Sequence, residues 1–358
     1  MRRSSMRYEY SSKPRECPAC GSGPVADILW GMPEMSPRLE EDLAAGRVIL
    51  GGCCVSGDDP IWACASCKIE IYATRSPVAS VLSWNVGQAG KPRGDVSVLN
   101  PFEHGQPPID IVTLQEVPAQ ASSQFLERLD EMGLTNATYS RLPADGGMSY
   151  GSIIASRWPL EPQGRSAGVS ALSYPQMVAH ASVALFEKAV HVITLHAPNG
   201  SGYGWTKIRT LRAVQALVES IRGEPCILTG DFNEPQFDLQ DGRIVTWGQE
   251  RDGPHDRYEC WKKWTFDGES GTGAEWDTAV RWFFENGHEH GLRLALWDAC
   301  GPGTMVETHT NRHRPRWFDH AFVSRDFRVE SCRSLREPEF REVSDHSPQL
   351  VELTADRR

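Results

Sequence analysis

Two C-x-x-C pairs near the N-terminus limit what the first part of this chain can fold into. Cys17 and Cys20 form the first pair, and Cys64 and Cys67 form the second. Each pair can place two thiolates on one ion, and two pairs complete the tetrahedral shell of four thiolates found at structural zinc sites. The sequence therefore predicts a zinc-ribbon-like domain over residues 16–76, with Zn2+ bound by these four cysteines.

The spacing between the two pairs leaves alternatives open. The gap from Gly21 to Ala63 exceeds the roughly 15 to 20 residues usual in a ribbon, and a helix over Pro37 to Ala45 would absorb the excess. Cys53 and Cys54 stand beside two glycines and compete as ligands. The cysteines can also be read as small buried apolar side chains, because free cysteines often behave in that way.

Composition narrows the class of protein. Only four of the ten cysteines lie beyond residue 70, which favours metal binding over a disulfide framework. The formal net charge of -10 argues against diffuse attraction to a polyanion as the main binding mode. No stretch approaches the ~18 uninterrupted apolar residues of a membrane span. Residues 1–15 are basic and serine-rich but lack the apolar core of a signal peptide, so we expect a disordered N-terminus, a cytoplasmic location and no membrane partner.

Beyond Ser76-Pro77, short apolar runs alternate with helical patterns, which indicates one α/β domain over residues 78–355. The apolar runs predict strands because they are short, rich in β-branched residues and bounded by turn formers. They are Val78 to Val86, Ile109 to Val117, Ser152 to Ser156, Val178 to Phe186, Val190 to Leu195, Cys226 to Thr229, Phe318 to Ser324 and Gln349 to Leu353. Ala121 to Met132 and Thr206 to Arg222 carry apolar residues at helical spacing and are each followed by glycine, so they predict amphipathic helices.

A tryptophan-rich stretch at about 236–297 is predicted to be an insertion within this domain. It carries Trp247, Trp261, Trp264, Trp276, Trp282 and Trp297. Tryptophan is highly buried on average, which favours packing within an inserted subdomain. The alternative is a stacking surface for a base or another flat ligand, formed where Trp261 and Trp264 flank two lysines.

Polar side chains follow several of the predicted strands. Asn85 in S-W-N-V and Glu116 in L-Q-E-V each stand at a strand end. Asp231 and Asn233 in G-D-F-N stand at another, and period-2 alternation sends both side chains to one face if the strand continues through them. The same tetrapeptide is also compatible with a tight turn in which Asp and Asn bond their own backbone.

The order of the motifs is more specific than any one of them. In sequence stand S-W-N-V, L-Q-E-V, Y-G-S-I-I-A-S-R, L-H-A-P-N, G-D-F-N, W-F-D-H and S-D-H-S-P. In this order they resemble the endonuclease/exonuclease/phosphatase superfamily, which has the deoxyribonuclease I-like fold. The resemblance covers Val78 to about Leu353 and implies a four-layered α/β sandwich, with two mixed sheets face to face and helices outside.

The resemblance also implies a metal site and a group that acts on water. Asn85 and Glu116 match the family's metal-binding pair, and Asp345 of the terminal motif is assigned to the same ion. Mg2+, or Mn2+ in its place, suits these hard oxygen donors. Asp231 matches a carboxylate that orients or deprotonates the attacking water, and Asn233 matches an amide that donates to a phosphate oxygen.

Further positions complete the implied catalytic set. His346 matches the terminal histidine, and Asp319 matches the acidic residue that holds it in one tautomer and favours its charged form. His196 matches a histidine that protonates the leaving oxygen in part of the family. Its alternative is a strand histidine satisfied by backbone groups. Asn199 matches a position that supports the phosphate.

Two arginines are further candidates for substrate binding. Arg314 and Arg316 precede the strand that carries Asp319, and arginine binds phosphate bidentately. The alternative is that both lie in a solvated loop.

The resemblance and the residues that match it imply a Mg2+-dependent phosphoesterase. The preferred interpretation is a nuclease or other phosphodiesterase that cleaves nucleic acid by in-line attack of water. His196 and the zinc ribbon favour a nucleic-acid substrate, and the ribbon is also a candidate site for a protein partner. One alternative is a phosphomonoesterase or small-molecule phosphodiesterase acting on a nucleotide, inositol or lipid head group, which the acidic net charge favours. Another is a catalytically silent module that binds nucleic acid or protein.

Overall fold

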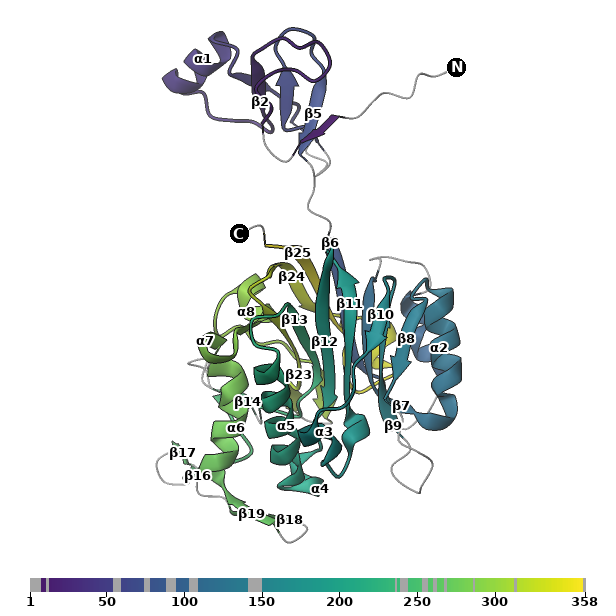
Figure 1. Ribbon diagram of the computed structural model, residues 1–358. Helices are drawn as coiled ribbons and strands as arrows, with labels where there is room; N and C mark the ends of the chain where they lie inside the picture. Colours follow the sequence, from purple (N-terminus) through teal and green to yellow (C-terminus); the bar gives the residue numbers. More distant parts are fainter. Residues whose placement is uncertain are drawn as a thin grey trace. The chain divides into compact units, whose positions relative to one another are not determined.

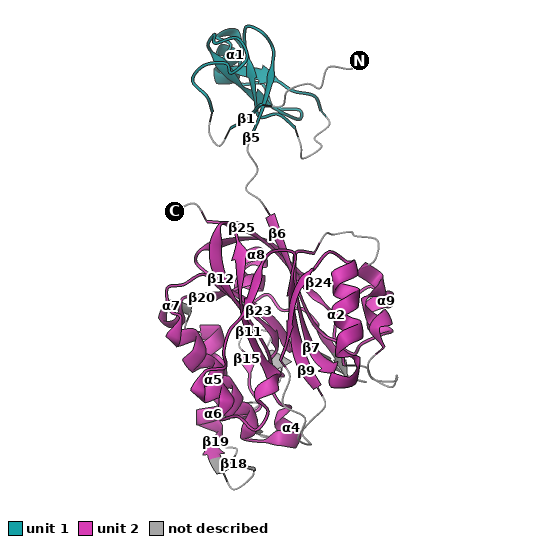
Figure 2. Ribbon diagram, turned by 45° about the vertical axis from the view of Figure 1, so that its right-hand side comes forward, with its two compact units in different colours: residues 1–76 teal, residues 77–358 magenta. Residues whose placement is uncertain are grey.

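The computed structural model describes residues 8–10, 13–53, 59–73, 78–87, 95–102, 109–140, 150–235, 237–238, 244–252, 257–259, 263–266, 269–285, 287–311 and 314–356. The chain divides into two compact units, residues 1–76 and 77–358 (Figure 2). Each unit has sheets of its own.

The described residues of the first unit form a five-stranded sheet with one helix. In the order β1-β5-β4-β2-β3, its strands are β1 (Tyr8–Tyr10), β5 (Glu70–Ala73), β4 (Trp62–Cys64), β2 (Val25–Leu29) and β3 (Val48–Leu50). Helix α1 (Pro37–Ala44) begins after Ser36, whose hydroxyl accepts from the backbone N–H of Leu39. The helix lies in the long gap between the cysteine pairs, where the sequence predicts one.

Part of the N-terminal segment for which the sequence predicts disorder is ordered. Within residues 1–15, strand β1 pairs in parallel with β5, with Tyr8 opposite Ile71. Residues 1–7, 11 and 12 lie outside the described residues.

The second unit contains two six-stranded mixed sheets. The first has the order β24 (Phe327–Ser334), β25 (Gln349–Ala355), β6 (Val78–Asn85), β7 (Ile111–Pro118), β9 (Tyr150–Ser156) and β8 (Asn136–Tyr139). The second has the order β10 (Leu160–Pro162), β11 (Val178–Leu185), β12 (Lys188–His196), β13 (Cys226–Asp231), β23 (Asp319–Ser324) and β20 (Leu292–Leu294).

Helices cover the outer faces of these sheets (Figure 1). On the side of the first sheet lie η1 (Val96–Phe102), η2 (Ala119–Ala121), α2 (Ser122–Glu131) and α9 (Pro338–Arg341). The remaining helices are α3 (Ala167–Ser170), η3 (Pro175–Met177), α4 (Gly200–Tyr203), α5 (Thr206–Ser220), α6 (Gly273–Glu285), α7 (Gly287–His290) and α8 (Ala295–Cys300). Among the described residues, no helix has both the length and the apolar character needed to cross a bilayer.

The alternation of side chains along the strands creates the layers. In β6, Val81 packs in the core shared by the two sheets, and its neighbour Leu82 packs in the core beneath α2, beside Phe125. In β12, Val192 lies in the first of these cores, which continues outward to Ile208 of α5. The predicted four-layered sandwich is confirmed: helix, sheet, sheet, helix.

All eight predicted strands are present in the second unit, with ends shifted by a few residues. Four strands of the two sheets were not predicted: β8, β10, β20 and β24. β10 and β20 are short strands at the edges of the second sheet, and β24 mixes exposed and buried residues instead of forming an apolar run. A short or mixed segment of this kind lacks the hydrophobic pattern that identifies a strand from sequence.

The described part of the tryptophan-rich stretch includes helix α6, the edge strand β20 of the second sheet and several small hairpins. Trp276 of α6 is completely buried, and β20 pairs with β23 in the second sheet. Four small hairpins lie outside the main sheets: β14 (Phe237–Asp238) with β15 (Ile244–Val245), β16 (Glu250–Asp252) with β17 (Arg257–Glu259), β18 (Lys263–Phe266) with β19 (Glu269–Thr272), and β21 (His309–Asn311) with β22 (Arg314–Arg316). The candidate stacking surface around Trp261 lies outside the described residues.

Strand direction brings several polar strand ends to one edge of the sandwich. β6 and β7 run parallel, and so do β12 and β13. At the ends of β12 and β13, His196 is paired with Asp231, and Asp231 is also paired with Asp319 at the start of β23. The polar residues predicted from separate motifs therefore meet at this edge.

Gly230 permits the close approach of β12 and β13 next to this edge. Its φ is +134°, and a Cβ added there would lie 2.0 Å from the carbonyl oxygen of Leu195. We expect Gly230→Ala to lower the free energy of unfolding of the second unit by about 3 kcal/mol or more, because the clash is with backbone.

Gly223→Ala is the matched control. Gly223 also has a positive φ, +90°, but an added Cβ would meet nothing within 4 Å, so its cost should stay near 1 kcal/mol. Urea denaturation followed by tryptophan fluorescence measures both. Equal losses in the two variants would show that the close approach at Gly230 is not what limits substitution.

Candidate active site

Asn85 joins two carboxylates that come from different sheets. Its Nδ2 donates to Glu116 Oε1 at 3.2 Å and to Asp231 Oδ2 at 3.0 Å. Its Oδ1 accepts from the backbone N–H of Gly87 at 2.9 Å, and the side chain is completely buried. The structure thus brings together the predicted pair Asn85 and Glu116 and adds Asp231 to it.

A bulge in β7 turns Glu116 toward this group. The pairing of β7 with β9 shifts between Leu114 and Val117, and Glu116 has a φ of 57°. A left-handed backbone is uncommon for a residue with a Cβ and is often found where a side chain is re-aimed at a site. The carboxylate of Glu116 remains 28% exposed, so it is accessible from solvent.

Asp231 and Asn233 meet through a turn and not through an extended strand. β13 ends at Asp231, and Asn233 has a φ of 51°. Asp231 Oδ1 accepts from the backbone N–H of Asn233 at 2.7 Å, and Asn233 Nδ2 donates to Asp231 Oδ2 at 3.2 Å and to the Ala197 carbonyl at 3.0 Å. The period-2 argument is therefore wrong here, because the strand does not continue. The tight turn, which the sequence left as the alternative, brings the two side chains together.

His346 forms a buried acid–imidazole pair with Asp319. Its Nδ1 donates to Asp319 Oδ2 at 2.8 Å, and its Nε2 lies 3.7 Å from Asp231 Oδ2. Burial opposes a charge on the ring, but the carboxylates of Asp319 and Asp231 outweigh it and raise the pKa of His346 to about 10. The ring is therefore an imidazolium at neutral pH.

The terminal motif is tied to the first one by buried hydrogen bonds. Trp84 Nε1 donates to the carbonyl of His346 at 2.8 Å. The hydroxyl of Ser344 lies 2.8 Å from the carbonyl oxygens of both Asn85 and Gly87, and it accepts from the N–H of His346. These contacts fix the position of His346 relative to β6.

His196 and Asp345 contact different residues of the cluster. His196 Nε2 is 3.4 Å from Glu116 Oε1 and 3.6 Å from Asp231 Oδ2. Asp345 Oδ2 instead lies 3.6 Å from Nε2 of His309, which the sequence did not indicate as a site residue. Although burial acts in the opposite direction, His309 and His346 hold the pKa of Asp345 below its ordinary value.

The donor set beside Gly87 suits a hard divalent cation. A Cβ at Gly87 would lie 2.6 Å from Glu116 Oε2 and 3.0 Å from Asn85 Oδ1, so the missing side chain leaves space next to these two oxygens. Carboxylate and amide oxygens are the ligands that Mg2+ prefers. Glu116 and Asn85 are therefore the residues that would hold such an ion.

The structure places the predicted substrate-binding residues in different environments. Asn199 is exposed, and its Oδ1 accepts from the N–H of Ser201, so it caps α4. The Arg316 guanidinium lies over the ring of Trp247, 5.5 Å from its centroid. The side chain of Arg314 lies outside the described residues.

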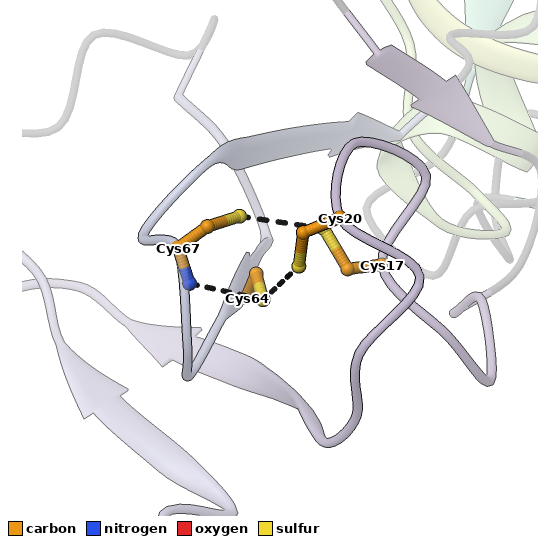
Figure 3. A group of neighbouring side chains, drawn as sticks. All are labelled: Cys17, Cys20, Cys64 and Cys67. Carbon is orange, nitrogen blue, oxygen red and sulfur yellow. Dashed lines mark hydrogen bonds between the residues drawn. The ribbon is translucent and has the colours of Figure 1, made fainter.

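A second candidate metal centre lies in the first unit. Figure 3 shows Cys17, Cys20, Cys64 and Cys67 with their sulfur atoms directed toward one another. Sγ of Cys17 is 3.5 Å from that of Cys67, and Sγ of Cys20 is 3.7 Å from that of Cys64. A tetrahedral site with Zn–S bonds of about 2.3 Å separates its sulfurs by about 3.8 Å, so the arrangement is compatible with a zinc ribbon.

The other two N-terminal cysteines were the competing ligands. Cys53 is not one of the four clustered residues, and Cys54 lies outside the described residues. The backbone N–H of Cys67 donates to Sγ of Cys64 and is the main cause of the lowering of the Cys64 pKa to about 6. A thiolate is the form that binds metal.

Comparison with known proteins concerns mainly the second unit. A model of the Endonuclease/Exonuclease/phosphatase family matches residues 82–346, whereas no curated protein matches the chain. Among solved structures, the 3' phosphatase NExo from Neisseria, bound to a product DNA hairpin, has a TM-score of 0.54 at 19% identity, covering 78% of this chain and 99% of that one.

Two further structures are similar. TDP2 from D. rerio, complexed with a single strand DNA product, has a TM-score of 0.52 at 14% identity and covers 78% of this chain and 99% of its own. ANGEL2, a 2',3'-cyclic phosphatase in complex with adenosine-2',3'-vanadate, has a TM-score of 0.50 at 15% identity and covers 79% and 97%. At these identities the likeness establishes a shared fold.

The pairing of His346 with Asp319 should be visible in its titration. In the metal-free protein the folded-state pKa of about 10 exceeds the ordinary value of 6.5. The imidazolium therefore stabilises the fold fully below about pH 6.5, and this stabilisation is lost as the pH rises through about 10. Asp319→Asn should lower the pKa of His346, because it removes the carboxylate that counteracts the effect of burial. NMR titration of the histidine ring signals in EDTA measures both values.

Asp130→Asn, on the exposed surface of α2, is the control and should leave that titration unchanged. A wild-type His346 that titrates near 6.5 would contradict the ion pair.

Proposed function

The chain belongs to the Endonuclease/Exonuclease/phosphatase family, whose enzymes are metal-dependent phosphoester hydrolases, and on this premise we propose that it is a Mg2+-dependent phosphodiesterase acting on nucleic acid. The observation that supports the proposal most directly is the Asn85 amide. It bonds Glu116 and Asp231 at once and so combines the residues for metal and for water in one cluster. His346 and His196 flank Asp231 in the same cluster.

The mechanism follows from the charges of these groups. When bound at Asn85 and Glu116, Mg2+ supplies a Lewis acid that neutralises charge on the phosphate oxygens. Asp319 and Asp231 raise the pKa of His346 against the effect of burial, and we assign this ring the role of donor to a phosphate oxygen. We assign to Asp231, which contacts Asn85 and Asn233, the role of orienting the attacking water and taking its proton.

His196 is the candidate general acid. Its Nε2 lies beside Glu116 and Asp231, and the side chain is 12% exposed, which gives a substrate access to the ring. An imidazole within reach of the leaving oxygen can supply the proton that this oxygen needs. Asn233 gives both N–H groups of its amide to Asp231 Oδ2 and to the Ala197 carbonyl, so in this structure it orients Asp231, and the phosphate-donor role would require one of these bonds to break.

Several observations favour nucleic acid as the substrate. Two solved structures of the same fold, NExo and TDP2, were obtained with DNA. Arg316 lies against Trp247, whose Nε1 donates to the carbonyl of Asn233. A guanidinium therefore stands close to the turn formed by Asp231 and Asn233, which we call the catalytic turn. An arginine at this position suits the binding of a phosphate of the nucleic-acid backbone.

The second candidate is a phosphomonoesterase or a small-molecule phosphodiesterase. The net charge of -10 favours it, because a polyanionic substrate would be repelled at long range. NExo, itself a DNA-bound structure of this fold, is described as a 3' phosphatase, and ANGEL2 as a 2',3'-cyclic phosphatase. Both structures are thus named as phosphatases, and NExo is also bound to DNA, so NExo is compatible with either candidate function.

Asp231→Ala tests the catalytic assignment. We expect hydrolysis in Mg2+ to fall by about 100- to 10,000-fold, because the acceptor for the proton of water is lost. The assay compares single- and double-stranded DNA, RNA, a generic phosphodiester and a phosphomonoester, and repeats each with Mn2+. Asp130→Ala, on the exposed face of α2, is the control and should keep full activity.

The pattern of substrates separates the candidates. Cleavage of polymers that disappears in Asp231→Ala supports the nuclease. Cleavage of small esters alone supports the second candidate. No hydrolysis with either metal ion would contradict both and favour a binding module.

We propose that the first unit is a zinc ribbon that binds one Zn2+ through its four clustered cysteines. The convergence of four sulfur atoms supports this assignment. Thiolate ligation needs reduced cysteines, which suits a protein of the reducing cytoplasm. A small module of this kind would serve to bind nucleic acid or a protein partner.

Zinc content tests this assignment. We expect about one Zn2+ per chain in the wild type and its loss in Cys20→Ser, measured by elemental analysis after dialysis. Cys53→Ser should retain the metal, since Cys53 lies outside the cluster. Retention of zinc by Cys20→Ser would overturn the proposed ligand set.

A further inference from the structure

A lysine and a glutamate are completely buried directly behind the catalytic turn. Lys207 belongs to α5 and Glu234 follows Asn233 in the chain, and both side chains have an exposed fraction of 0%. Their Nζ and Oε1 atoms are 3.3 Å apart. The mechanism proposed above uses neither side chain, so their presence requires another explanation.

The glutamate is held from three directions. Trp276 Nε1 donates to Glu234 Oε1 at 2.6 Å, and the backbone N–H of Trp247 donates to Oε2 at 3.3 Å. The carbonyl of Glu234 accepts from His320 Nε2 at 2.7 Å. Burial lowers the pKa of His320 to about 4, so this ring is neutral and its Nε2–H is the donor. Glu234 therefore cannot shift without breaking contacts to α6 and β23.

The lysine reaches the catalytic turn itself. Lys207 Nζ donates to the backbone carbonyl of Asn233, and the same carbonyl accepts from Trp247 Nε1 at 3.2 Å. Asn233 also donates its backbone N–H to Asp231 and its amide to Asp231 and Ala197. Its left-handed φ of 51° is thus fixed by bonds on both sides of the residue.

Stability of the fold alone does not account for a buried pair. Removing two charges from water is costly, and well-packed apolar residues often stabilise a core as well or better. An apolar side chain at position 207, however, could not donate to the Asn233 carbonyl. The ammonium needs a buried counter-charge, and Glu234 supplies it.

We propose that Lys207 and Glu234 are positioning residues that hold Asn233 in its left-handed conformation and so keep its amide beside Asp231. The inference rests on the proposed function, because it concerns the geometry of that same site. Lys207 acts on the reaction through the carbonyl of Asn233, and Glu234 acts through Lys207.

A test must separate this role from the cost of an unpaired buried charge. Burial lowers the pKa of Lys207 and raises that of Glu234, and each effect is opposed by the partner. A single substitution therefore leaves the other group without its counter-charge. The double variant Lys207→Met with Glu234→Gln removes both charges; Gln can still accept from Trp276 Nε1, but its NH2 group cannot accept from the Trp247 N–H as Oε2 does.

The experiment compares the wild type, Lys207→Met, Glu234→Gln and the double variant. We expect Lys207→Met to lower the melting temperature and to lower kcat by up to about 100-fold, with a smaller change in KM. In the double variant we expect the melting temperature to return toward the wild-type value while kcat stays low. Lys188→Met, at an exposed ion pair with Asp326, is the control and should change neither quantity.

Hydrogen exchange gives a readout that does not depend on turnover. The backbone N–H of Asn233, which donates to Asp231 in the wild type, should exchange at least about 10-fold faster in Lys207→Met and in the double variant than in the wild type. Recovery of both melting temperature and kcat in the double variant would overturn the proposal, and so would unchanged exchange at Asn233. If the wild type hydrolyses no phosphoester, the proposed function fails, and the exchange rates still decide whether the pair positions Asn233.

Discussion

A hydrogen bond between the two sheets holds the candidate active site together. Apolar side chains such as Val81 and Val192 fill the space between the sheets, but polar contacts also cross it. They are Thr113 with Thr229 at 2.8 Å, Gln115 with Thr194 at 2.8 Å and, at the catalytic edge, Asn85 with Asp231 at 3.0 Å. A hydrogen bond tolerates less sliding than apolar packing does, so these contacts fix the relative position of strands that carry different parts of the site.

Two buried carboxylates near the end of β13 each have a positively charged counterpart. Asp319 has His346 on the catalytic side, and Glu234 has Lys207 on the other. Asp231 lies 3.7 Å from the same His346 ring, and the carboxylate of Glu116 lies beside Asn85 and His196. The catalytic side therefore carries surplus negative charge, and a divalent cation is the simplest group that would neutralise it.

The sequence was sufficient for the parts of the fold that are encoded locally. The eight strands, α2 and α5 follow from apolar periodicity, and the motif order led to the four-layered architecture. Local sequence patterns do not indicate contacts that join residues distant in the chain. His309 meets Asp345 only because β21 folds beside the terminal motif. The burial of Lys207 has a sequence signal: the residue stands four positions before Leu211 and so lies on the apolar stripe of α5.

Two residues of the site, Glu116 and Asn233, have φ values of 57° and 51°. Glycine adopts this left-handed region readily, and residues with a Cβ adopt it less often. Their side chains are needed for the chemistry, so glycine cannot take their places in an active enzyme. Folding must therefore offset a conformational cost that only catalysis justifies. Selection for thermal stability alone would tend to erode this edge of the protein, and a variant improved in that way would gain resistance to heat as it lost turnover.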